Sequence, residues 1–164
     1  MEVKLKQLIV ILLIMFVSCG NVRAFDYIME LHGKREIIKS YPLSKDKRYL
    51  NFILEGTFTD NYGNIGLFNA VVSSDVKEGK LIKLDTTAEV VYSNNEKIYF
   101  RGVREKSDVD AGIAYGIMVG TTKRLQPLIG SKCTTSVRYL NDTIFGLNKC
   151  KISENSKKIL NDIN

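Results

Sequence analysis

Late in the chain the sequence reads Cys133-Thr-Thr-Ser-Val-Arg-Tyr-Leu-Asn-Asp-Thr-Ile-Phe-Gly-Leu-Asn-Lys-Cys150. Asn141 and Asp142 tolerate the positive φ that a two-residue turn demands, so this stretch is typical of a β-hairpin with its loop at these residues. In that register Cys133 and Cys150 face each other at a non-hydrogen-bonded pair, where side chains approach closely enough for a disulfide bond. The register therefore predicts a Cys133–Cys150 disulfide; the alternative is two unpaired buried thiols.

Residues 1–24 have the pattern of a signal peptide, with a basic start, an apolar run over 8–17 and a small-residue cleavage pattern ending at Ala24. The apolar run is too short to span a bilayer. The alternative is a lipid anchor at Cys19, because the residues around it resemble a bacterial lipobox. If the signal is removed, two cysteines remain, and an even number suits an oxidising compartment. We therefore expect an exported protein, periplasmic or secreted.

The charge of the mature chain excludes one class of partner. Removing residues 1–24 leaves 21 basic and 17 acidic residues, a net charge of +4. These basic residues are scattered and mixed with acids, which serves solubility and does not form the basic stripe of a nucleic-acid-binding protein. We expect no nucleic-acid partner and no membrane span.

Alternating apolar residues indicate a series of β-strands. The clearest strand covers 50–60, where the positions that share one face are Leu50, Phe52, Leu54, Gly56 and Phe58. Further strands are expected over 65–74, with Phe68, Ala70 and Val72 on the core face, and over 83–92, 97–103 and 111–121, with one or two before residue 50 at 27–31 and 36–38. A charged loop is expected over 105–109, and a second loop contains Pro127.

Strands of this length joined by sequential hairpins predict an all-β fold: a single antiparallel up-and-down barrel of about eight strands, closed by the C-terminal disulfide hairpin. A barrel also removes the exposed edges that such long strands would offer for aggregation. The expected barrel domain covers 25–152. Residues 153–164 form a short C-terminal tail, either disordered or an amphipathic helix.

The strand over 111–121 has Gly112, Gly116 and Gly120 every fourth residue, so we expect them on one side of it, where they permit sharp coiling or close approach. The loop that follows reads Gly120-Thr-Thr-Lys-Arg-Leu-Gln-Pro-Leu-Ile-Gly130 and resembles a loop of the small barrels of the allene oxide cyclase and dirigent type. Thr122 stands where that family has Gly. The resemblance implies an eight-stranded barrel, and no catalytic or ligand residue of that family has a counterpart here.

No catalytic or metal-binding constellation is present in the sequence. His32 is the only histidine, no Ser or Cys nucleophile motif accompanies it, and a zinc site needs more ligands. Asp108-Val-Asp110-Ala-Gly112 is similar to the start of a calcium loop but lacks the third acid and the distal Glu. We therefore predict no catalytic residue, no metal and no cofactor.

The candidate ligand-cavity residues are Glu89, Tyr99, Arg101 and Tyr115. If the strands over 83–92 and 97–103 pair, Glu89 and Arg101 would form a buried pair in the barrel mouth; the alternative is that these charges lie on the outward, solvated face. The interior of an eight-stranded barrel is only large enough for its own side chains or for one small ligand.

These patterns favour a non-enzymatic exported barrel that binds a small apolar molecule or serves as a structural module. One alternative is a barrel-type isomerase or cyclase that uses Glu89, Tyr99 or Arg101. Another is a secreted inhibitor or interaction module that binds a protein through its loops. A continuous interior cavity would favour the first two, and a filled barrel with a protruding loop would favour the third.

Overall fold

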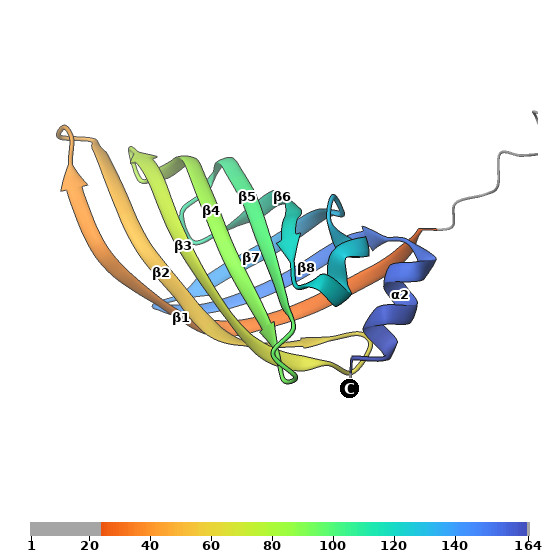
Figure 1. Ribbon diagram of the computed structural model, residues 1–164. Coiled ribbons are helices and arrows are strands. Elements are labelled where there is room, and N and C mark those ends of the chain that lie inside the picture. The colour runs from red at the N-terminus through yellow and green to blue at the C-terminus, as the bar shows by residue number, and fades with distance from the viewer. Residues whose placement is uncertain (1–23, 164) are drawn as a thin grey trace, which may run out of the picture.

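The computed structural model describes residues 24–163, and within them eight antiparallel strands close into a barrel in sequence order (Figure 1). The strands are β1 (Phe25–Pro42), β2 (Lys47–Asp60), β3 (Ile65–Lys77), β4 (Lys80–Tyr92), β5 (Lys97–Asp108), β6 (Ala111–Thr121), β7 (Lys132–Leu140) and β8 (Thr143–Ile152). The 3-10 helix η1 (Lys123–Leu128) joins β6 to β7, and the helix α2 (Glu154–Asn161) follows β8. The predicted fold class is confirmed. The signal-peptide and lipid-anchor predictions lie outside the described residues, apart from Ala24.

The barrel closes where the first strand meets the last. β1 pairs with β8 from Phe25↔Ile152 to Lys34↔Thr143, antiparallel and without a register shift. Because every strand then has two neighbours, no edge is left to recruit a strand from another chain over that length.

The predicted hairpin register is confirmed. Cys133 pairs with Cys150 and Leu140 with Thr143, which leaves Asn141 and Asp142 as the loop, and Asn141 has the positive φ of 54°. A disulfide joins Cys133 to Cys150. The two cysteines are 5% and 0% exposed, so the bond faces the interior of the barrel.

Two strands are longer than predicted. β1 is one continuous strand of 18 residues, although we expected one or two short strands at 27–31 and 36–38, because its outer half pairs with β2 up to Pro42↔Arg48. β5 continues to Asp108 through the charged stretch that we expected to be a loop. The charges suit a strand here because they lie opposite charges on β4, as in the pair Lys83↔Glu105.

Alternation along each strand sends one set of side chains inward. On β2 and β3 these include the predicted core residues Leu50, Phe52, Leu54, Phe58, Phe68, Ala70 and Val72, all buried. On β5 the inward positions are Ile98, Phe100, Gly102 and Arg104, and only the last of these is charged.

The glycines of β6 are not all on one side. Gly116 lies on the inner face, where it pairs with Gly102, whereas Gly120 pairs with Tyr99, whose side chain is exposed on the outer face. A bulge at Val119, between the pairs Tyr99↔Gly120 and Phe100↔Met118, shifts the alternation by one residue. The expectation that three glycines share a face is therefore wrong for Gly120.

The two ends of the barrel differ. The helix end carries α2 and η1, and Figure 1 shows α2 lying beside it while the β1–β2 hairpin extends away at the other end. Asn64 Nδ2 donates to the Leu160 carbonyl oxygen at 3.0 Å, and Ser156 Oγ donates to the Pro127 carbonyl oxygen at 3.0 Å. Ser153 caps α2 by accepting from the Ser156 amide. The helical alternative for the C-terminal segment is thus the one observed.

Candidate functional site

The interior of the barrel holds a cavity of about 120 Å³ lined by residues of all eight strands. Most of the lining is apolar, and the polar side chains that face it are Thr86, Arg104, Thr135, Tyr139 and Asn148. A cavity of about 150 Å³ is enough to hold benzene in an apolar protein core. The space therefore suits one small molecule and is well below the size of a drug-like pocket.

Large side chains fill the helix end and confine the cavity to the rest of the barrel. Tyr27 and Tyr92 are 0% and 2% exposed, their hydroxyls hydrogen-bond to each other, and Phe58 packs edge-on against Tyr92 with ring centroids 5.2 Å apart. None of these three residues lines the cavity.

Beside the disulfide, the cavity wall contains a hydrogen-bonded pair of polar side chains. Thr135 Oγ1 donates to Asn148 Oδ1 at 2.8 Å, and Asn148 Nδ2 lies 3.6 Å from Cys150 Sγ. Asn148 is only 4% exposed. The hydrogen-bonding groups of Asn148 have partners inside the wall. The Thr135–Asn148 pair therefore shapes the cavity and needs no hydrogen bond from a ligand.

Arg104 is the one cationic side chain whose burial is nearly complete among the residues described, at 2% exposed. Its Nη2 donates to the Val109 carbonyl oxygen at 2.9 Å, but Nε and Nη1 have no hydrogen-bond partner within residues 24–163. Burial lowers the pKa of the Arg104 guanidinium, an effect that Tyr139 and Asp110 oppose. A guanidinium stays protonated at neutral pH even so, which leaves a charged group with two unpartnered nitrogens in the cavity wall.

Tyr139 lies beside this arginine and is 7% exposed. The guanidinium carbon of Arg35 is 4.8 Å from the centroid of its ring. Burial raises the pKa of the Tyr139 hydroxyl, while Arg104 and Arg35 oppose that rise, so the hydroxyl is a neutral donor near pH 7. Within the described part of the chain this hydroxyl makes no hydrogen bond.

Arg35 itself belongs to the hairpin end. Its Nη2 donates to the Asn141 carbonyl oxygen at 3.1 Å and lies 3.4 Å from Asp142 Oδ1, and its Nη1 is 3.9 Å from Asp110 Oδ1. Arg35 thus has carboxylate partners, whereas no carboxylate of the described residues lies within 4.0 Å of Arg104.

The sequence did not point to Arg104 as a site residue. The expected strand covers 97–103 and gives way to a charged loop over 105–109. Residue 104 therefore lies outside the predicted strand, and the alternation of that strand does not assign it to the inner face. The hairpin register places Tyr139 on the same face as Cys133, in agreement with its burial.

Two of the four predicted cavity residues lie on the outer face. Glu89 and Tyr99 pair across β4 and β5 there, Tyr99 is 37% exposed, and neither lines the interior cavity. Glu89 Oε1 is 2.8 Å from Lys97 Nζ, and this contact lowers the pKa of Glu89. The cause is the strand alternation: the inward positions of β4 near this point are Ala88 and Val90. The outward, solvated alternative describes both residues.

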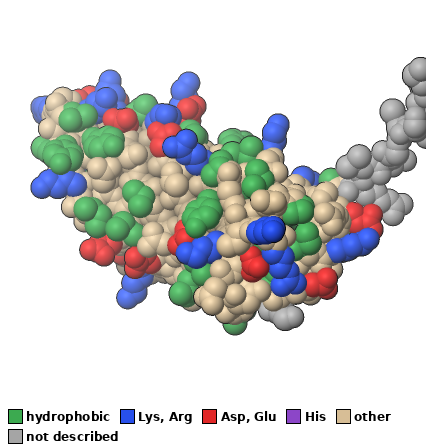
Figure 2. Space-filling view, in the orientation of Figure 1, with side chains coloured by type: hydrophobic (Ala, Val, Ile, Leu, Met, Phe, Trp, Pro, Cys, Tyr) green, Lys and Arg blue, Asp and Glu red, His purple; other side chains and the backbone are tan. Residues whose placement is uncertain are grey.

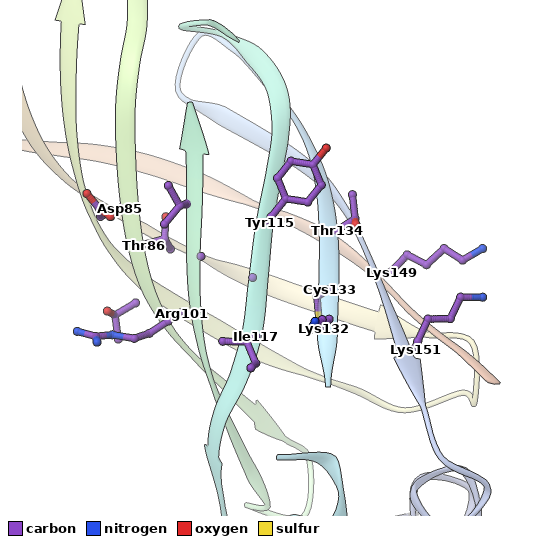
Figure 3. A pocket seen from close by; sticks show the side chains of 14 residues that line it. Asp85, Thr86, Arg101, Tyr115, Ile117, Lys132, Cys133, Thr134, Lys149 and Lys151 are labelled. Carbon is purple, nitrogen blue, oxygen red and sulfur yellow. The ribbon is translucent and has the colours of Figure 1, made fainter. Parts of the chain in front are cut away.

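Arg101 and Tyr115 flank the glycine pair Gly102↔Gly116, and both residues also contribute to the cavity wall. Their side chains lie in a broad outer groove of about 920 Å³ that crosses β4 to β8, where Tyr115 is 68% exposed (Figure 3). The groove is therefore separated from the cavity only by backbone at the two glycines.

Two of the basic residues that line the outer groove are already paired. Lys149 and Lys151 lie on β8 and contact Asp26 at 2.8 and 2.5 Å. Hydrogen bonds from the two lysines lower the pKa of Asp26. The groove thus offers less free positive charge than its lysines suggest.

The remaining sequence candidates carry no site. His32 is exposed on β1 and contacts Phe145 edge-on, with ring centroids 5.7 Å apart. Over residues 24–163 no three His, Cys, Asp or Glu side chains are grouped so that they could hold a metal ion.

No protein-family model matches this chain, and no curated protein matches it. In the part of the chain that the structure describes, the helices are too short or too polar to cross a bilayer.

Proposed function

We propose that this protein is an exported binding module that holds one small apolar molecule in the interior of its barrel. The observation that carries the proposal is the cavity of about 120 Å³, because inward side chains that packed efficiently would leave few voids larger than a water molecule. Apolar walls with a small number of convergent polar groups are typical of small-molecule sites.

Export is part of the same proposal. It is supported by the signal-peptide pattern of residues 1–24 and by the disulfide, which is compatible with an oxidising compartment such as the periplasm or the extracellular medium.

Toluene titration, followed by the NMR shifts of methyl groups around the cavity, tests the proposal. Ala88→Leu adds volume on the inner face of β4, where Ala88 lines the cavity, and should abolish binding. The matched control is Thr87→Leu, which adds apolar volume at the neighbouring exposed position. Unchanged methyl shifts in the wild-type protein would reject the proposal.

A barrel-type isomerase or cyclase is the first alternative. An enzyme working inside the barrel would have Arg104 and Tyr139 as its ionisable groups, since Glu89 and Tyr99 lie outside. Glu89→Gln should then leave any turnover unchanged, and a loss of turnover would point to the outer face instead.

An interaction module is the second alternative, favoured by the β1–β2 hairpin that extends past the barrel. Ile37, Tyr41 and Leu43 are 51%, 47% and 56% exposed there. Figure 2 shows hydrophobic side chains mixed with charged ones over this part of the molecule. A protein partner would lose affinity when these three residues are replaced by Ser, whereas a cavity ligand would not.

A further inference from the structure

A buried guanidinium with unused donors is costly unless something binds to it. Moving a charged group out of water is unfavourable by several kcal/mol, and unpaired buried donors add to that. Arg104 is 2% exposed and has one protein acceptor, the Val109 carbonyl, for five N–H donors. The protein thus retains an arginine at a position where an apolar residue would be less costly.

The Arg104 side chain lies in the cavity wall. Arg104 and Tyr139 both line it, at the end of the barrel away from α2. Besides the N–H that it donates to Val109, Nη2 keeps one N–H that runs parallel to an N–H of the unpartnered Nε or Nη1, and the Tyr139 hydroxyl is a further unused donor among the described residues. Planar, paired N–H donors match two oxygens of a carboxylate or of a phosphate, and the carboxylate is the smaller and less strongly charged of these two groups.

No protein carboxylate fills this role. Asp110, whose charge acts on Arg104, and Asp142 both lie within 4.0 Å of Arg35, and their side chains are 72% and 73% exposed. The acidic groups are therefore held at the surface by Arg35, which leaves the inner arginine free for a group that enters the cavity.

We propose that the cavity ligand is a small carboxylic acid, bound as its carboxylate by Arg104 and Tyr139 with its apolar body in the cavity. This inference rests on the proposed function and names the chemical class of the ligand. At about 120 Å³ the cavity limits the apolar body to about one benzene ring or a short alkyl chain.

Benzoate and toluene form the matched pair of probes, because they share the ring and differ in the charged group. Isothermal titration at neutral pH should show benzoate binding about tenfold or more tightly than toluene, as expected for a charge-assisted pair. NMR shifts of methyl groups around the cavity would place both probes inside the barrel.

Arg104→Met removes the guanidinium and keeps a long side chain. It should weaken benzoate binding about ten- to hundredfold while leaving toluene binding within about threefold. Arg138→Met is the control, since Arg138 is an exposed arginine on β7 and does not line the cavity. It should change neither affinity.

Tyr139→Phe provides a second test that does not depend on how the barrel tolerates Arg104→Met. The hydroxyl has no partner in residues 24–163, so its removal should leave the fold unchanged and weaken benzoate by about three- to tenfold. Circular dichroism would check the fold of each variant.

The outcomes separate the two proposals. Toluene binding with no preference for benzoate, or benzoate binding that Arg104→Met leaves unchanged, would overturn the carboxylate inference and retain the cavity function. If neither probe binds the wild-type barrel, both proposals fail.

Discussion

The position of the Arg104 side chain depends on the absence of a side chain at Gly112. A Cβ atom at Gly112 would lie 3.0 Å from Arg104 Cδ and 2.9 Å from Ser107 Oγ. The guanidinium therefore reaches the cavity over a glycine, and the inner face of β6 is shaped to admit it. In our proposal, position 104 combines a binding group with a cost in stability, which is common at functional sites.

Without ligand, Arg104→Met should stabilise the protein. The change removes a buried charge with two unpartnered donors and loses one hydrogen bond, to Val109, so the free energy of unfolding should rise by about 1–3 kcal/mol. Urea denaturation followed by circular dichroism measures this. A lower midpoint than that of the wild type would show that Arg104 serves chiefly to hold the β5–β6 turn.

Alanine substitutions at the paired glycines Gly102 and Gly116 should have different effects on the free energy of unfolding. A Cβ atom at Gly116 would lie 2.9 Å from the Arg101 carbonyl oxygen, whereas one at Gly102 would meet its nearest neighbour, the Tyr115 carbonyl oxygen, at 3.5 Å. Gly116→Ala should therefore cost about 1–3 kcal/mol. Gly102→Ala should be neutral or stabilising by up to about 1 kcal/mol, because alanine restricts the unfolded chain. Thermal denaturation of both variants tests this, and equal shifts would contradict it.

Buried tyrosines at the helix end predict a loss of stability in alkali. Burial raises the pKa of Tyr27 well above its ordinary value of 10.0, and it raises that of Tyr92 too. Their contribution to stability is fully present below pH 10.0, and it is lost as pH rises further, because the unfolded chain then releases protons that the folded chain retains.

Above pH 10 the free energy of unfolding should fall by about 1.4 kcal/mol per pH unit for each phenol that stays protonated. Urea midpoints measured over a pH series would give the slope. The double variant Tyr27→Phe/Tyr92→Phe should have a shallower slope above about pH 10 and the same pH dependence as the wild type below about pH 9. A slope unchanged by the double substitution would argue against these two residues as the cause.

At the scale of elements, α2 acts as a cover for one end of the barrel. Leu160 and Ile163 are 0% and 3% exposed, and the side chains of Asn64 and Asn94 donate to their carbonyl oxygens. The turns after β2 and β4 are thus tied to the C-terminal segment, which leaves the opposite end as the side nearer the cavity's charged group.

Leu160→Ala should remove most of this attachment. Truncating a fully buried leucine costs about 2–5 kcal/mol, and hydrogen exchange should increase in the turns that carry Asn64 and Asn94. Asn155→Ala, at an exposed position of the same helix, is the control and should change the free energy of unfolding by less than about 0.5 kcal/mol. Equal effects of the two variants would mean that α2 does not pack as described.

At the scale of the whole molecule, the sequence was sufficient for the architecture because the architecture follows from local rules. Alternation defines strands, Asn141-Asp142 sets the last hairpin, and the pairing that follows brings Cys133 to Cys150. Consecutive hairpins then leave a closed barrel as the arrangement that removes exposed edges.

The residues of the candidate site were harder to predict from the same local rules. Alternation says which residues share a face but not which face is inside, so Glu89 and Tyr99 were assigned to a cavity that lies on the other side of the sheet. A single bulge at Val119 reverses the faces near the end of β6. The decisive residue, Arg104, lies in a charged stretch whose strand character depends on cross-strand partners in β4.

Both sulfurs of the Cys133–Cys150 bridge are shielded from solvent, so a thiol reductant attacks them only when neighbouring strands part. The rate of cleavage by dithiothreitol therefore reports how often the strands around the disulfide open in the native protein. Cleavage should run far more slowly than in urea-unfolded chains, and more slowly still when a bound molecule holds the wall shut. Cleavage as fast in native protein as in unfolded chains would show that the wall is porous at this point. In a cell, the bridge once formed would be insulated from passing thiols for as long as the tube stays closed.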